Sequence, residues 1–310
     1  MFREVPARLR AFVPVLALPL AAAVFGCAAK SGGSGGFTTD AGDVDSGGLL
    51  VGNDGGAIVS ECSDASKLVY VVSKESGLYS FDPPSAVFKL IGHLGCLVGG
   101  AAPNSMAVDR TGTAWISYTD GSVWKVSTKD ASCVTSPYVA DQLGFHTFGM
   151  GYSSNDADPT KDTLYIDDHD GKGLAKVDAS GKAAKIALFG TPLQGKNCEL
   201  TGTGDGRLFG FFTTTPAQVA EIDKATGAIL SSQSLSAVST GTEWAFSFWG
   251  GDFFLYTAQA SNGGLPQNDV STDVTRYRPS DKSVTVIKKN IGFRIVGAGV
   301  STCAPTTSPK

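Results

Sequence analysis

The residues best suited to chemistry in this chain are polar side chains that stand directly before short apolar segments. Five such segments occur, and the polar residues before them are Asn104 and Ser105, His146 and Thr147, Glu199, Glu243, and Arg294. Carboxylates, an imidazole, an amide and a guanidinium can bind a polar ligand, hold a divalent cation or transfer protons. If the five segments surround one axis, these side chains meet at one end of it.

Three interpretations of this polar set stay open. In the first, Arg294 pairs with Glu199 or Glu243 and only fastens neighbouring segments together. In the second, the whole set binds a ligand at the end of the axis. In the third, Glu199, Glu243 and Asn104 hold a divalent cation and support acid–base or hydrolytic chemistry. We predict that the set binds a ligand, and we name no catalytic residue. We predict no cofactor, and a divalent cation is the alternative.

Two other acidic stretches could hold a cation. Residues 167–171 read Asp-Asp-His-Asp-Gly, which we interpret as an exposed acidic turn. A second stretch contains Asn155, Asp156, Asp158 and Asp162, for which calcium is an alternative. The common nucleophile, zinc-protease, phosphate-loop and dinucleotide motifs are absent from the sequence.

A repeat predicts the elements that position the polar set. An apolar strand, a glycine-containing turn, an aromatic-rich second strand and a third strand recur, and successive second strands begin 44 to 49 residues apart. This is the length of one four-stranded propeller blade. We therefore predict an all-β fold, a β-propeller of five four-stranded blades over residues 62–303. In it, residues 133–140 form the last strand of the second blade. Residues 295–301 supply the inner strand that the first blade lacks, so the C-terminal strand closes the ring.

Two turns carry a family resemblance. The sequences D-R-T-G-T-A-W at residues 109–115 and G-D-G-R-L-F at residues 204–209 resemble turns of NHL, SMP-30 and streptogramin-lyase propellers. Residues 62–303 also resemble uncharacterised secreted lipoproteins of myxobacteria, around residues 105–118, 199–212 and 276–303. The resemblance implies the propeller fold. Its motifs are structural and carry no known chemistry, and SMP-30 enzymes usually have six blades.

The N-terminal residues predict export. Three arginines precede an apolar run at residues 11–24, which has the length of a signal-peptide core. Val24-Phe25-Gly26-Cys27 resembles a bacterial lipobox, which implies a signal peptide at residues 1–26 and a lipidated Cys27. Ala28 then implies, by the same resemblance, the outer membrane on its periplasmic or cell-surface side. Residues 27–61 are rich in Gly, Ser and Asp and read as a disordered linker, and residues 304–310 as a tail.

The remaining cysteines fit an exported protein. Apart from Cys27 there are five, so one thiol is left over. Cys62 and Cys303 fall in the same connection of the first blade and are expected to pair. Cys96 with Cys133 is the next best pairing, which leaves Cys198 free.

The composition limits the classes of molecule that this chain is expected to bind. The net charge is −4, and the chain has no Lys/Arg run, so nucleic acid is excluded and the membrane is reached only through the lipid. We predict a monomeric envelope lipoprotein whose propeller binds an unknown protein, peptide or small molecule. The alternatives are an SMP-30-like lactonase or lyase-like enzyme with a metal in the central channel, and a structural envelope protein.

Overall fold

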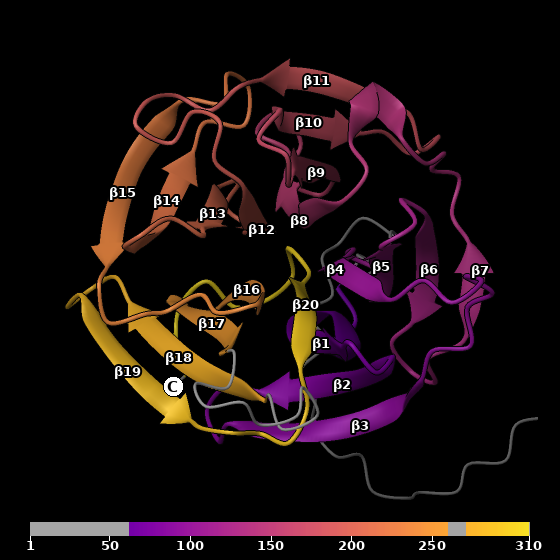
Figure 1. Cartoon of the computed structure of the whole chain (residues 1–310), viewed down its shortest axis with the longest axis horizontal. Helices are drawn as coiled ribbons and strands as arrows, with labels where there is room; N and C mark the ends of the chain where they lie inside the picture. Colours follow the sequence, from indigo (N-terminus) through magenta and orange to yellow (C-terminus); the bar gives the residue numbers. More distant parts are fainter. Residues whose placement is uncertain (1–61, 260–270, 310) are drawn as a thin grey trace, which may run out of the picture. The chain divides into compact units, whose positions relative to one another are not determined.

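The computed structural model describes residues 62–259 and 271–309 (Figure 1). The chain divides into two units, Met1–Gly56 and Ala57–Lys310, and the described residues belong to the second. The predicted signal peptide, the lipidation site Cys27 and the linker up to residue 61 lie outside them. Within the described part, no helix is long and apolar enough to cross a membrane.

In the described residues, twenty strands form five antiparallel four-stranded sheets, with two short 3-10 helices, η1 (Asp64–Lys67) and η2 (Gln142–Gly144). Blade 1 contains β20 (Ile295–Val300), β1 (Val69–Ser73), β2 (Gly77–Asp82) and β3 (Val87–His93). Blade 2 contains β4 (Pro103–Val108), β5 (Thr113–Tyr118), β6 (Val123–Ser127) and β7 (Cys133–Thr135). Blade 3 contains β8 (Phe148–Ser154), β9 (Asp162–Asp168), β10 (Gly173–Val177) and β11 (Ala183–Ala187). Blade 4 contains β12 (Cys198–Gly202), β13 (Leu208–Phe212), β14 (Ala217–Ile222) and β15 (Ile229–Leu235). Blade 5 contains β16 (Glu243–Trp249), β17 (Asp252–Ala258), β18 (Thr272–Arg278) and β19 (Ser283–Lys288).

The five-bladed propeller and its closure are confirmed. Figure 1 shows β20, the last strand of the chain, beside β1, the first, and Val300 pairs with Val69 across them. β20 also packs against β16 and β4, the inner strands of the two neighbouring blades. One strand from the C-terminus therefore completes blade 1 and joins blade 5 to blade 2.

The predicted extent of the last strand of blade 2 was wrong. β7 ends at Thr135, whereas a strand up to residue 140 was expected. Pro137 has no N–H to give to a ladder, and Tyr138 turns inward, where its ring meets Phe148 at 5.6 Å. The pattern of apolar residues continues beyond the strand because Tyr138 is buried between blades and not within the sheet.

Inner strands of the ring lie very close together. A Cβ atom placed on Gly149 of β8 would lie 2.2 Å from the carbonyl oxygen of Cys198 in β12. One placed on Gly297 of β20 would lie 2.8 Å from the main-chain nitrogen of Met106 in β4. Such distances exclude a side chain, so a five-bladed ring with these spacings requires glycine at both positions.

Both predicted disulfides are confirmed. Cys62 pairs with Cys303 and Cys96 with Cys133, and Cys198 is the free cysteine of the described residues. The first bond joins residues 241 positions apart and ties the start of blade 1 to the end of its inner strand. In the chain-entropy model a loop of this length contributes about 5 kcal/mol to folding stability.

A chain that ends at Asn290 should fail to fold. It lacks β20, so β1 has no partner on its inner edge and the apolar faces of β4 and β16 lose their neighbour. A chain that ends at Ala304 is the matched control and should keep a cooperative melt. Circular dichroism and size-exclusion chromatography compare the two, and a monomeric, cooperatively melting protein ending at Asn290 would contradict the shared-blade closure.

Candidate functional site

The predicted polar residues occupy the starts of the inner strands, and several lie inside the strands and not before them. Asn104 and Ser105 belong to β4, Glu199 to β12 and Glu243 to β16, while His146 and Thr147 precede β8 and Arg294 precedes β20. We call this end of the ring the channel mouth. The structure divides the set into a buried cluster and an outer rim.

The buried cluster joins three blades. Ser105 donates a hydrogen bond of 2.6 Å to Oε2 of Glu199 and accepts one of 3.2 Å from the N–H of Met150. The other oxygen, Oε1 of Glu199, lies 3.5 Å from Nε2 of His169 at the end of β9. Because Ser105 and Glu199 come from blades 2 and 4, they meet across β8 of blade 3.

Enclosure dominates the electrostatics of this cluster. Glu199 is 1% exposed, and burial raises the pKa of its carboxyl group, although the interactions with His169 and Ser105 act in the opposite direction. Burial also raises the pKa of Asp167 well above its ordinary value, and the nearby charges of Asp168 and Glu199 add to that. Oδ2 of Asp167 accepts a 2.7 Å hydrogen bond from the N–H of Cys198. Two acidic groups thus share a region with little solvent.

The interpretation of residues 167–171 as an exposed acidic turn was wrong for Asp167 and Asp168. Both are 0% exposed, because they end β9, which is paired on both sides with β8 and β10. The His169 side chain is 15% exposed and its ring centroid lies 6.2 Å from that of Trp244. His169 is also held by its N–H, which donates to the carbonyl oxygen of Thr147 at 3.0 Å.

Charged pairs form the outer rim. Glu243 pairs with Lys74, and Arg294 donates to Oε1 of Glu75 at 2.8 Å through Nε. The expected pairing of Arg294 with Glu199 or Glu243 was therefore wrong. Lys74 and Glu75 lie in the turn between β1 and β2, and the N–H of Lys74 bonds the carbonyl oxygen of Arg294, so the partner comes from the same blade.

Asn104 and His146 make contacts that do not involve Glu199. The amide of Asn104 donates 3.2 Å to the carbonyl oxygen of Phe148, which links β4 to β8. His146 is 54% exposed at its side chain and contacts Asp141 at 2.6 Å, an interaction that raises the pKa of the imidazole. The structure does not bring His146 into contact with the buried cluster.

His169, Lys74, Glu75 and Trp244 were not predicted at the channel mouth, although His169 was considered within residues 167–171. The signal for the first three was the antiparallel pairing itself: where an inner strand begins, the second strand of the same blade ends. Residues that directly follow second strands therefore arrive at the channel mouth together with those that precede inner strands. Trp244 follows Glu243 within β16 and packs against the apolar cluster between blades 4 and 5.

Metal ligation is not supported by the side chains that were considered for it. Among the described residues, no group of three or more His, Cys, Asp and Glu side chains is placed to hold a metal ion. The second acidic stretch is dispersed: Asp156 pairs with Lys224 at 2.7 Å, Asp158 accepts from Thr160 and Asp162 accepts from Thr302. Its residues do not form one calcium site.

A polar cavity of about 560 Å³ lies beside the cluster. Its lining includes His169, Asp170, Lys196, Asn197, Thr213 and Thr214. His169 therefore contacts the cavity on one side and Glu199 on the other, so a molecule in the cavity could change the environment of the buried carboxyl group.

Comparison with protein-family models gave no match, and neither did comparison with curated proteins. Solved structures gave matches to β-propellers at low identity. A regucalcin from Agrobacterium tumefaciens is 17% identical, with 76% of this chain and 75% of that chain covered and a TM-score of 0.43. Virginiamycin B lyase from Staphylococcus aureus is 12% identical, with 76% and 74% covered and a TM-score of 0.41. A protein of unknown function from Bacteroides caccae is 10% identical, with 75% and 97% covered and a TM-score of 0.43.

Replacing Glu199 by Gln should flatten the dependence of stability on pH. The native pKa of Glu199 is raised above its unfolded value, so the folded state binds this proton more tightly and gains stability as the pH falls. That contribution is complete below the unfolded pKa and is lost as the pH rises through the native one. Between pH 4.5 and 7.5 the melting temperature of Glu199→Gln should therefore fall less than that of the parent; some fall remains because Asp167 still titrates.

Glu221→Gln is the matched control, since Glu221 lies on β14, the third strand of blade 4, and bonds Arg207 there. It should follow the parent curve. If Glu199→Gln instead showed the same pH dependence as the parent, Glu199 would not be the enclosed group described above.

Proposed function

We propose that this chain is an exported, monomeric β-propeller lipoprotein that binds a small polar ligand at the channel mouth. Cys27 carries the lipid at the outer membrane, and residues 27–61 act as the tether. The observation that carries the binding role is the position of His169 between the buried Glu199 carboxyl group and the polar cavity.

Stability alone gives no reason for this arrangement. Oδ1 of Asp167 is buried and has no hydrogen-bond partner within residues 62–259 and 271–309, and the buried Nε2 of His169 makes no hydrogen bond there beyond its 3.5 Å charge contact with Glu199. A buried polar atom without a partner costs about 1 to 3 kcal/mol. Groups kept at such a cost, in a cavity and with raised acid pKa values, are typical of functional sites.

The surroundings fit a ligand that has hydroxyl groups and one apolar face. Trp244 offers an aromatic side chain next to His169, and the pairs Lys74–Glu243 and Glu75–Arg294 offer donors and acceptors at the rim. Sugars and sugar acids combine these features, because their hydroxyl groups bond polar side chains while their C–H faces pack on aromatic rings.

A lactonase-like or lyase-like enzyme is the second candidate. The observation in its favour is the raised pKa of Glu199 next to an imidazole, since burial that favours the protonated carboxyl group suits a general acid. The same cluster serves both candidates, and turnover of a substrate distinguishes them.

Four probes test the proposal on the purified full chain: glucose, N-acetylglucosamine, gluconate and gluconolactone. We expect at least one to raise the melting temperature, because a ligand that binds only the folded state stabilises it. His169→Gln should raise the concentration needed for half of that effect roughly tenfold, as expected for a lost contact worth about 1.4 kcal/mol. His93→Gln is the matched control, because His93 ends the outer strand β3.

Absence of any response to the four probes in the parent would contradict this ligand class. Hydrolysis of gluconolactone above the buffer rate, abolished in Glu199→Gln, would replace the binding role with the enzyme.

Replacing Cys27 by Ser tests the anchor. The substitution removes the thiol that receives the lipid, so incorporation of a labelled fatty acid should be lost and the protein should leave the membrane fraction. Fatty-acid labelling that persists in Cys27→Ser would show that the lipid is attached elsewhere or that the lipobox interpretation is wrong.

A further inference from the structure

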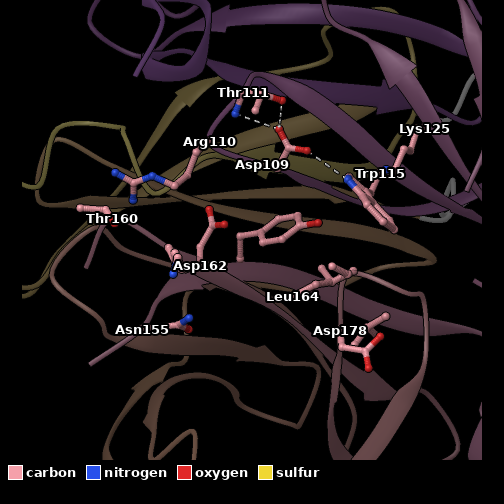
Figure 2. A pocket seen from close by; sticks show the side chains of 14 residues that line it. Asp109, Arg110, Thr111, Trp115, Lys125, Asn155, Thr160, Asp162, Leu164 and Asp178 are labelled. Carbon is pink, nitrogen blue, oxygen red and sulfur yellow. Dashed lines mark hydrogen bonds between the residues drawn. The ribbon is translucent and has the colours of Figure 1, made fainter. Parts of the chain in front are cut away.

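A second cavity, of about 660 Å³, opens between blades 2 and 3 at the ends of the inner strands opposite to the channel mouth. We call it the blade 2–3 cavity. Its wall is built from the turn after β4, from β5 and β6, from the end of β8 and from the start of β9 (Figure 2). It shares no lining residue with the polar cavity beside His169.

Asp162 gives this cavity a negative charge that no cation contacts closely. Its side chain accepts 3.1 Å from Thr302, and no ion pair of Asp162 is found in the described part of the chain. The nearby Arg110 guanidinium donates to Thr302 and to the carbonyl oxygen of Pro159. Burial raises the pKa of Asp162 to about 6; the charge of Asp109 adds to this, while Thr302 and Arg110 oppose it. A cation that enters the cavity would therefore stabilise the ionised carboxylate of Asp162.

Tyr152 is a second, independent observation. It lines the cavity and is 7% exposed, yet its hydroxyl group has no hydrogen-bond partner within residues 62–259 and 271–309. Burial raises the pKa of the phenol well above its ordinary value, and the charges of Asp109 and Asp162 add to this. The Tyr152 side chain is therefore largely buried, while its hydroxyl group is available to a molecule inside the cavity.

Asp109 is committed to the fold. Oδ1 accepts from the N–H groups of Thr111 and Thr113, and Oδ2 accepts 3.2 Å from Nε1 of Trp115, as Figure 2 shows in part. These bonds hold its carboxylate in place and also hold the indole against the cavity. Its charge adds to that of Asp162, but its oxygens are already occupied.

Lys125 provides the opposite charge. Its ammonium group lies 4.4 Å from the centroid of the Trp115 ring, and it makes no ion pair with a carboxylate in the part of the chain that the structure describes. The other lysine of the wall, Lys161, pairs with Asp158 at 3.2 Å. Figure 2 shows Lys125 and Asp162 on different sides of the cavity. Between them the wall is apolar, with Trp115, Leu164 and Val177.

We propose that the blade 2–3 cavity binds a zwitterion, a molecule with an ammonium group and a carboxylate joined by an apolar stem. The ammonium group lies at Asp162 and donates to the Tyr152 hydroxyl, the carboxylate meets Lys125, and the stem packs on Trp115 and Leu164. The charges complement each other, and the stem covers apolar surface that water otherwise contacts.

Isothermal titration calorimetry on the full chain tests this with matched probes. 6-Aminohexanoate and L-leucine carry both charges over a long and a short separation. Hexylamine and hexanoate each carry only one. We expect 6-aminohexanoate to bind, and L-leucine, hexylamine and hexanoate to bind at least tenfold more weakly, because each of these three can make only one of the two charge-assisted contacts.

Variants assign the contacts. Asp162→Asn and Lys125→Gln should each weaken the zwitterion at least tenfold, and Tyr152→Phe about fivefold, the effect of one neutral hydrogen bond. Asp281→Asn is the control, because it removes one negative charge from an exposed turn of blade 5. Lys125→Gln alters a half-exposed side chain, so it remains informative if Asp162→Asn does not fold.

No heat from 6-aminohexanoate at millimolar concentration would overturn the proposal. Equal affinity for hexanoate and 6-aminohexanoate, or affinity unchanged in Lys125→Gln, would also overturn it. None of these results affects the channel mouth, because the two cavities have no lining residue in common.

Discussion

The rest of the structure depends on how closely five inner strands approach one another. At Gly149 the neighbouring main chain lies within 2.2 Å of the position that a Cβ atom would take, so the axis accepts main chain and very few side chains. Ser105 and Glu199 are two of the groups that fill it, and they bond directly. Closing the ring therefore places a carboxyl group where little water reaches it. The raised pKa of Glu199 is a consequence of the blade number as much as of the residue.

The two ends of the ring differ because every inner strand begins at one end and finishes at the other, and every second strand runs the opposite way. At the channel mouth, inner strands begin and second strands end, which brings His169 to Glu199 and Lys74 to Glu243. At the opposite end, turns that contain Asp connect the first two strands of blades 2, 3 and 4. One of them holds Trp115 through Asp109 and forms the wall of the blade 2–3 cavity. Each end thus has its own polar chemistry, built by different parts of the repeat.

The fold was predictable because its signals are local and periodic. The blade-length repeat predicted the five sheets, and the position of Cys62 and Cys303 in one connection predicted their bond. The register placed Ser105 and Glu199 at the same end of the ring. It could not identify partners, because these come from other parts of the chain: His169 directly follows a second strand, and Glu75 lies in a turn. The blade 2–3 cavity could not be predicted from the sequence for the same reason. Its Asp162 accepts a hydrogen bond from Thr302, which is 140 residues away in the chain.

The central claim is that ring closure encloses Glu199 and so alters its acidity. The most direct test is a carbon-13 NMR titration of the glutamate carboxyl groups, with the Glu199 signal assigned by its loss in Glu199→Gln. The account predicts a midpoint above about 4.3, the ordinary value for glutamate. A midpoint at or below that value would show that water or a cation reaches the carboxylate, and it would contradict the enclosed site on which the proposed function rests.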